Sequence, residues 1–158
     1  MTDETALEAA GGLDGGTLEG LFALSVRLYS HQLFEHSARI MEFLLRHDPA
    51  RPHYHRALGK ALHALQRHEQ AVQSYARAVR LGLPDADVHF YIGQCLIFLR
   101  RYELAEQALE RCLQLAGQQP KVPVSLIERA TELVARVRAL RRRASERQLA
   151  PTDIRETT

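Results

Sequence analysis

The feature that most constrains this chain is a segment that recurs every 34 residues. Its copies share an aromatic residue or His, then Glu, then apolar residues three and four places apart, and they begin at Phe34, His68 and Tyr102. The shared Glu residues, spaced by 34 in both intervals, are Glu35, Glu69 and Glu103. Because the interval is constant, the sequence predicts three structural units, at about 18–51, 52–85 and 86–119.

Each unit contains two apolar patterns of helical spacing on either side of a polar corner such as QRHEQ. At the eighth position of the last two units, Gly59 and Gly93 let the second helix approach the first. At the twentieth position, Ala71 and Ala105 keep that crossing close. One helix pair cannot bury its apolar face alone, so neighbouring units must stack. The pattern resembles the tetratricopeptide repeat and predicts an all-α fold, with three helix-turn-helix repeats in a short superhelical solenoid.

One further helix is predicted after the third unit. Gly117 is placed to end the preceding helix, and SLIE has the form of a capping box with Ser125 as the N-cap. An apolar stripe from Leu126 to Leu140 would then cover the open end of the third repeat. The predicted organisation is a flexible leader at 1–17, three 34-residue helical repeats at 18–119, a capping helix at 120–147 and a mobile tail at 148–158.

Composition and charge exclude several classes of protein. The formal net charge of +2 is too small to predict binding to nucleic acid or to an anionic membrane. The acidic first residues lack the basic and apolar regions of a secretory signal, and no apolar run is long enough to span a bilayer. Abundant Arg and Ala with no Asn is typical of a GC-rich bacterial genome. We therefore expect a cytoplasmic bacterial protein without stable membrane insertion.

The spacing of reactive side chains does not assemble a catalytic site. HEQAV at His68 lacks the second His of HExxH, and His63 lies five residues away, off the same helix face. Cys95 and Cys112 form no CxxC pair and are expected to be buried thiols. The basic run RALRRR is expected to be a solvated helix end. The sequence therefore predicts no enzyme activity, no metal and no cofactor.

The predicted binding surface follows from the repeat itself. The first helices of stacked repeats line a concave face, and their inward positions combine apolar ends with a basic, His-bearing middle. Aromatic residues gathered on one exposed face usually mark an interaction site. The candidate peptide-binding residues are Phe22, Val26, Tyr29, Arg56, Lys60, His63, Phe90, Gln94 and Ile97.

A narrower resemblance covers about 18–119 and the trailing helix. LEGLFALSVRLYSHQLFEHS and YIGQCLIFLRRYELAEQALE resemble the class II chaperones of bacterial type III secretion, the translocator chaperones. The resemblance implies a cytoplasmic chaperone that binds an extended, Pro-flanked segment of a hydrophobic translocator and keeps this subunit soluble and export-competent. Phe22, Val26 and Tyr29 match aromatic groove positions of that family. Whether the chain forms a homodimer stays open, because its short Gly-rich leader departs from the arm through which some members dimerise.

Two alternative functions differ in the partner that they imply. A general repeat adaptor could capture an acidic C-terminus, but the positions of the carboxylate clamp carry Phe22, Val26 and Asp87 here. A chaperone of the needle subunit is the second alternative, although such chaperones are generally shorter and lack a long trailing helix.

Overall fold

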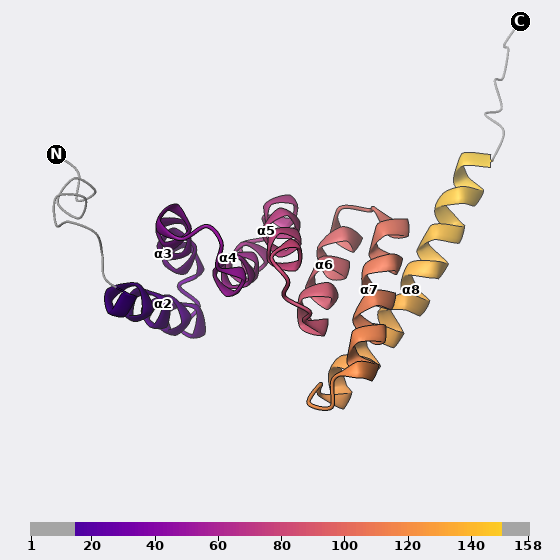
Figure 1. Cartoon of the computed structure of the whole chain (residues 1–158). Helices are drawn as coiled ribbons and strands as arrows, with labels where there is room; N and C mark the ends of the chain where they lie inside the picture. Colours follow the sequence, from indigo (N-terminus) through magenta and orange to yellow (C-terminus); the bar gives the residue numbers. More distant parts are fainter. Residues whose placement is uncertain (1–14, 150–158) are drawn as a thin grey trace, which may run out of the picture. The chain divides into compact units, whose positions relative to one another are not determined.

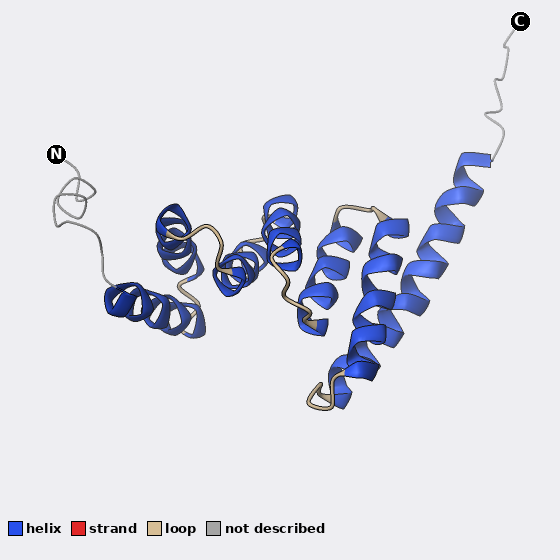
Figure 2. Cartoon of the chain, viewed as in Figure 1, coloured by secondary structure: helices blue, strands red, loops and turns tan. Residues whose placement is uncertain are grey.

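A computed structural model describes residues 15–149, and this part of the chain is built from seven α-helices (Figures 1 and 2). No β-strand occurs between residues 15 and 149, so the prediction of an all-α fold is confirmed. The helices are α2 (Gly15–Ser30), α3 (Phe34–His47), α4 (Pro52–Ala64), α5 (His68–Arg80), α6 (Ala86–Phe98), α7 (Tyr102–Gln118) and α8 (Val124–Leu149).

The chain divides into two compact units, one from Met1 to Leu83 and one from Pro84 to Thr158. The first unit contains α2 to α5 and the second contains α6 to α8. Residues 1–14 and 150–158, which hold most of the predicted leader and tail, lie outside the described residues. The helical region is longer than predicted at both ends, because α2 begins at Gly15 and α8 continues to Leu149. Within the described range no helix is long and apolar enough to cross a membrane.

The helix pairs close on the small residues that the repeat predicts. A Cβ atom added to Gly59 on α4 would lie 2.6 Å from Cε1 of Tyr75 on α5. A Cβ atom on Gly93 of α6 would likewise lie 2.6 Å from Cγ of Leu109 on α7. Ala71 and its counterpart Ala105 are completely buried at the same crossings. The predicted role of these glycines and alanines in close helix approach is therefore confirmed.

The first helix pair closes in a different way, because serines occupy both small positions. Ser25 on α2 and Ser37 on α3 are buried, and their hydroxyl oxygens are 2.9 Å apart. The Ser25 hydroxyl also lies 3.1 Å from the Ser37 carbonyl oxygen, to which it can donate. A buried hydroxyl without a hydrogen-bond partner is costly. Each of these serines can be buried because the other provides its partner.

The first helix of each pair ends on a residue with left-handed backbone conformation. In the turn between α4 and α5, the Gln66 N–H donates to the His63 carbonyl and the Arg67 N–H donates to the Leu62 carbonyl, both at 2.9 Å. This is the Schellman arrangement, in which Gly is usual because a side chain is strained at positive φ. The three residues that adopt this conformation are Gln32, Gln66 and Arg100, with φ of 62°, 59° and 57°.

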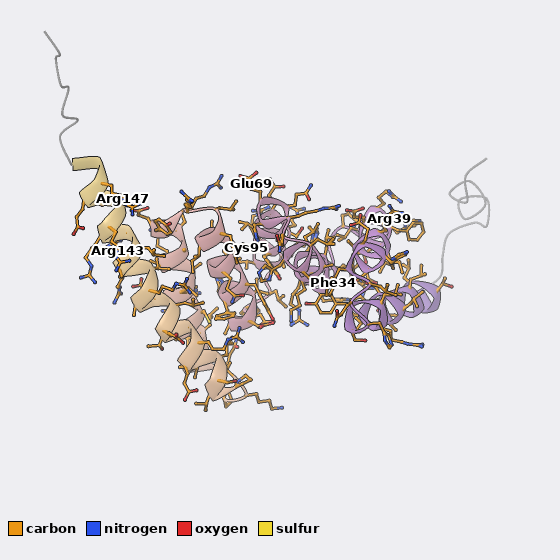
Figure 3. All side chains as sticks on the ribbon, turned by 180° about the vertical axis from the view of Figure 1, so that it is seen from behind. Phe34, Arg39, Glu69, Cys95, Arg143 and Arg147 are labelled. Carbon is orange, nitrogen blue, oxygen red and sulfur yellow. The ribbon has the colours of Figure 1, made fainter. Side chains whose placement is uncertain are left out.

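Helix α8 is joined to α7 by apolar contacts and by a partly buried ionic cluster. Glu106 of α7 is only 8% exposed, and its two carboxylate oxygens lie 2.6 Å from Arg138 Nε and 2.8 Å from Arg141 Nη1. Arg138 also reaches Glu110 at 2.7 Å. The RALRRR run is solvated as expected, since the Arg138 and Arg141 side chains remain 51% and 43% exposed, but these two arginines also pair with α7, whereas Arg143 further along α8 is exposed (Figure 3).

Two predicted helix boundaries differ from the structure by about one residue. Gly117 lies inside α7, which continues to Gln118, and the Gln119 side chain then donates to the Pro84 carbonyl. Ser125 is not the residue before α8, because that helix already begins at Val124. The turn forms earlier than predicted since the Pro123 carbonyl accepts from the Leu126 N–H at 3.0 Å.

Candidate functional site

The first unit contains a hollow of about 230 Å³ between α2 and α4, with α3 beneath it. We call it the α2–α4 hollow. It collects five of the nine candidate residues predicted from the sequence: Phe22, Val26, Tyr29, Arg56 and Lys60. Its other lining residues are Ser25, Ser37, His53 and Ala57.

The α2 side of the hollow is aromatic and partly fixed by ring contacts. The Phe22 ring lies 5.2 Å from the His53 ring, edge to face, and 5.3 Å from the Tyr54 ring. Tyr29 makes a similar edge contact with Phe34 at 5.2 Å. Because Tyr54 belongs to the buried core, Phe22 is both a lining residue and a core contact. Val26, which is 49% exposed, presents apolar surface without those ring contacts.

The floor of the hollow is the buried Ser25–Ser37 pair described above. Both hydroxyl hydrogens can be used inside the pair, because Ser25 can donate to the Ser37 carbonyl and Ser37 to Ser25. Each hydroxyl oxygen retains a lone pair that the contacts within the pair do not use. The sequence carried a signal for this pair, since both small positions of one unit change to Ser together. The spacing of these two residues does not by itself indicate that their hydroxyls meet.

The α4 side of the hollow is cationic. Arg56 and Lys60 are half-buried and lie four residues apart, so their side chains share one face of α4. His53 stands one turn before Arg56. Burial holds the pKa of His53 below its usual value, and the positive charge of Arg51 lowers this pKa further. His53 is therefore mainly neutral near pH 7, and the permanent charge on this side comes from Arg56 and Lys60.

His63 does not line the α2–α4 hollow, although it belongs to the same unit. Its ring lies 5.8 Å from the ring of His68, across the turn between α4 and α5. Burial is the main cause that lowers the pKa of His63, and His68 lowers it further. The spacing of five residues predicts that His63 and His68 do not share a helix face, but the turn between α4 and α5 brings their rings together.

The remaining three candidates belong to the second unit. Gln94 and Ile97 lie half-buried on α6. Phe90 is only 1% exposed, so the prediction that it faces a binding surface is wrong. The reason is α8, whose Arg129 guanidinium lies 4.8 Å from the centre of the Phe90 ring.

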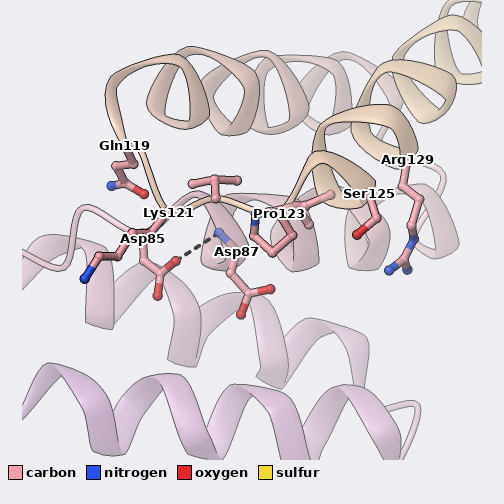
Figure 4. A pocket seen from close by; sticks show the side chains of 9 residues that line it. Asp85, Asp87, Gln119, Lys121, Pro123, Ser125 and Arg129 are labelled. Carbon is pink, nitrogen blue, oxygen red and sulfur yellow. Dashed lines mark hydrogen bonds between the residues drawn. The ribbon is translucent and has the colours of Figure 1, made fainter.

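A second hollow, of about 400 Å³, lies in the second unit where the loop after α7 returns to the start of α6 (Figure 4). Asp85 caps α6 by accepting from the Asp87 N–H at 3.0 Å. Lys121 and Arg129 stand on the same hollow, so its lining combines both signs of charge. The repeat pattern does not predict this hollow, because its shape depends on the path of the loop after α7.

The two cysteines are buried on α6 and α7. Burial raises the pKa of the Cys95 thiol to about 12 and that of the Cys112 thiol to about 11. Both thiols are therefore protonated at neutral pH and lack the thiolate form that acts as a nucleophile. The prediction that they are buried thiols is confirmed.

Comparison with protein families identifies the class of fold. The family model described as tetratricopeptide repeat matches residues 22–82 and 65–120. The chain therefore belongs to the tetratricopeptide-repeat family. Among curated proteins, none matches the chain significantly.

Solved structures narrow the resemblance to chaperones of type III secretion. PcrH from Pseudomonas aeruginosa is 28% identical, with a TM-score of 0.73 over 80% of this chain and 95% of PcrH. PcrH in complex with the chaperone-binding region of PopD is also 28% identical, with a TM-score of 0.76 over 81% and 96% of the two chains. The translocator chaperone SycD from Yersinia enterocolitica is 18% identical, with a TM-score of 0.77 over 86% and 93%, and shows the fold alone.

Proposed function

We propose that this protein is a translocator chaperone, which binds an extended segment of a hydrophobic type III secretion translocator in the α2–α4 hollow. The observation that carries the proposal is the concave surface where Phe22, Val26 and Tyr29 meet the face of α4. The likeness to PcrH, whose structure contains the chaperone-binding region of PopD, supports this choice of client. The protein acts by binding, without catalysis, in the bacterial cytoplasm.

The geometry of the hollow suits a single side chain of an extended segment. An apolar client residue that enters it removes its own surface and that of Val26 and Tyr29 from water, at about 25 cal/mol per Å². The ring contacts of Phe22 and Tyr29 hold this wall in place before the client arrives, so little side-chain entropy is lost on binding. A client held in this way cannot use the same segment to associate with other copies of itself.

The proposal is tested with two substitutions on one helix. Val26→Asp places a carboxylate in the hollow at a side chain that is 49% exposed, while Leu24→Asp places it at one that is 42% exposed and outside the hollow. Each variant is co-expressed with a translocator, and the amount of soluble client that purifies with the chaperone is measured.

We expect Val26→Asp to lose the client, because burying a carboxylate against an apolar residue is costly, and Leu24→Asp to retain it. Circular dichroism checks that both variants are folded. If Val26→Asp and Leu24→Asp retain the client equally well, the binding site is not the α2–α4 hollow.

A further inference from the structure

We propose that the second unit binds an acidic peptide segment of a partner protein. The site is a hollow of about 390 Å³, lined by the turn that joins α6 to α7, by the first turn of α7 and by the last part of α8. We call it the arginine hollow, because Arg100, Arg141 and Arg147 line it. This inference goes beyond the proposed function, since the proposed client site belongs to the first unit.

The lining of the arginine hollow carries an excess of positive charge. Its three arginines are opposed by one carboxylate, that of Glu103, among the residues that line it. A planar guanidinium donates two parallel hydrogen bonds to one carboxylate, which makes arginine better suited than lysine to the recognition of carboxylates. The lining therefore favours an anionic ligand.

Two of the three arginines are available to such a ligand. Arg100 and Arg147 are exposed, and neither forms an ion pair within residues 15–149. Arg147 lies near the end of α8 (Figure 3). Arg141 is already paired with Glu106, whose Oε2 atom lies 2.8 Å from Arg141 Nη1, so it is held in place beside the hollow. We therefore assign the binding to Arg100 and Arg147, with Arg141 as a fixed neighbouring charge.

The charge of Arg100 is not required by the turn in which it stands. Arg100 has left-handed backbone conformation, and the equivalent residues of the two preceding turns are Gln32 and Gln66. Their φ angles of 62° and 59° differ little from the 57° of Arg100, so an uncharged side chain is compatible with this conformation. Bringing a further cation to the arginines of α8 is unfavourable by itself, because like charges repel each other. An anionic ligand relieves that repulsion.

The positions of the cations suit a ligand with two separated charges. Arg141 and Arg147 are six residues apart, which corresponds to about 9 Å along a helix that rises about 1.5 Å per residue. Residues two apart in an extended peptide are separated by about 6.6 Å, since each residue advances the chain by about 3.3 Å. Long arginine side chains span the difference. Two carboxylates on one peptide segment therefore meet two cations at once, whereas a single phosphate ion presents its charge at one point.

Glu103 favours a peptide over a nucleic acid. Its carboxylate can accept a hydrogen bond from a backbone N–H group, which almost every residue of a peptide segment carries. The sugar–phosphate backbone of a nucleic acid has no N–H group, and its phosphates would be repelled by Glu103. The formal net charge of only +2 for the whole chain also disfavours nucleic acid. The chemistry of the lining therefore points to a peptide with acidic side chains.

The experiment follows the backbone amide and arginine Nε–H signals of the full chain by nuclear magnetic resonance during titration. Three peptides with identical Gly/Ser flanks have the central residues Glu-Ser-Glu, Gln-Ser-Gln and Lys-Ser-Lys. A short oligothymidylate and inorganic phosphate are the other ligands. The test variant combines Arg100→Gln with Arg147→Gln. The control variant has the same net charge and combines Arg136→Gln with Arg142→Gln, at two exposed positions of α8 outside the hollow.

We expect the wild-type chain to bind Glu-Ser-Glu about 10-fold more tightly than Gln-Ser-Gln, and Lys-Ser-Lys least tightly, because two charge pairs form at exposed side chains. The signals that shift should be those of residues 100–103 and 141–147, and the preference should decrease at high salt. The test variant loses the preference, while the control variant keeps it. Gln already occupies the equivalent turn positions, so the test variant should stay folded, which circular dichroism checks.

Three results overturn the inference. If the wild-type chain binds Glu-Ser-Glu and Gln-Ser-Gln equally, or if the preference persists in the test variant, the arginine hollow does not select acidic peptides. If the oligothymidylate binds at the same signals more tightly than Glu-Ser-Glu, the site belongs to nucleic acid. If inorganic phosphate binds there as tightly as Glu-Ser-Glu, the hollow attracts anions without selecting a peptide. None of these results involves the α2–α4 hollow, so the proposed function stands or fails by its own experiment.

Discussion

A single methyl group at Gly59 gives a sharp test of how closely the helices of one repeat approach each other. In Gly59→Ala the new Cβ atom would lie 2.6, 2.7 and 2.9 Å from three ring atoms of Tyr75. Tyr75 is completely buried, so the ring cannot move away without displacing the core around it. Overpacking of this kind costs about 1–3 kcal/mol.

The same substitution also has a favourable effect that must be subtracted. Ala in a helix interior is more favourable than Gly by about 0.5–1 kcal/mol, because Gly loses more backbone entropy on folding. The free energy of unfolding of Gly59→Ala should therefore decrease by up to about 2 kcal/mol. Gly20→Ala on α2 is the matched control, because its Cβ atom would meet nothing within 4 Å. This control should gain about 0.5–1 kcal/mol.

The assay is urea denaturation followed by far-ultraviolet circular dichroism. The two variants should move the midpoint in opposite directions, with Gly59→Ala below the wild type and Gly20→Ala above it. If Gly59→Ala is stabilised as much as Gly20→Ala, the helices do not approach at Gly59 as described. An unchanged slope in both variants supports the comparison of midpoints.

Three further perturbations test other parts of the structure. Gln66→Gly should raise the free energy of unfolding, because it removes a side chain from a residue with φ of 59°. Gln70→Gly within α5 should instead lower the free energy of unfolding by about 1 kcal/mol. Glu106→Gln should destabilise the second unit by about 1–3 kcal/mol, because Arg138 and Arg141 lose the carboxylate that they share. Glu110→Gln, at an exposed position of the same helix, is the control and should have a smaller effect. The pKa of His63 is lowered from the usual 6.5, so the unfolded state binds its proton more readily. The contribution of His63 to the free energy of unfolding is therefore fully present above about pH 6.5 and is lost as the pH falls below this value. Urea midpoints measured at about pH 7 and about pH 5 should differ less in His63→Gln than in the wild type.

The helix pairs of the repeats could be predicted from sequence because their determinants are local and periodic. The 34-residue period and the polar corners predicted where α3, α5 and α7 begin, at Phe34, His68 and Tyr102. Small residues at the same position of successive units predicted the crossings, because a larger side chain there would clash with the partner helix. The five candidates in the α2–α4 hollow were predicted for the same reason, since their direction is set by position along a helix.

The tertiary structure alone decided what lies outside this periodicity. The repeat assigns Phe90 the same place as Phe22, but α8 follows the last unit after an irregular loop and covers Phe90 with Arg129. The spacing of residues does not predict the path of that loop, and the path of the loop determines which side chain α8 covers. The Ser25–Ser37 pair and the Glu106 cluster are decided in the same way, because each joins two helices whose side chains meet only after packing. The sequence by itself determined the repeated helices and the faces that they bury. The contacts between unlike elements were decided only by the folded chain, because folding brings together residues that are far apart in the sequence.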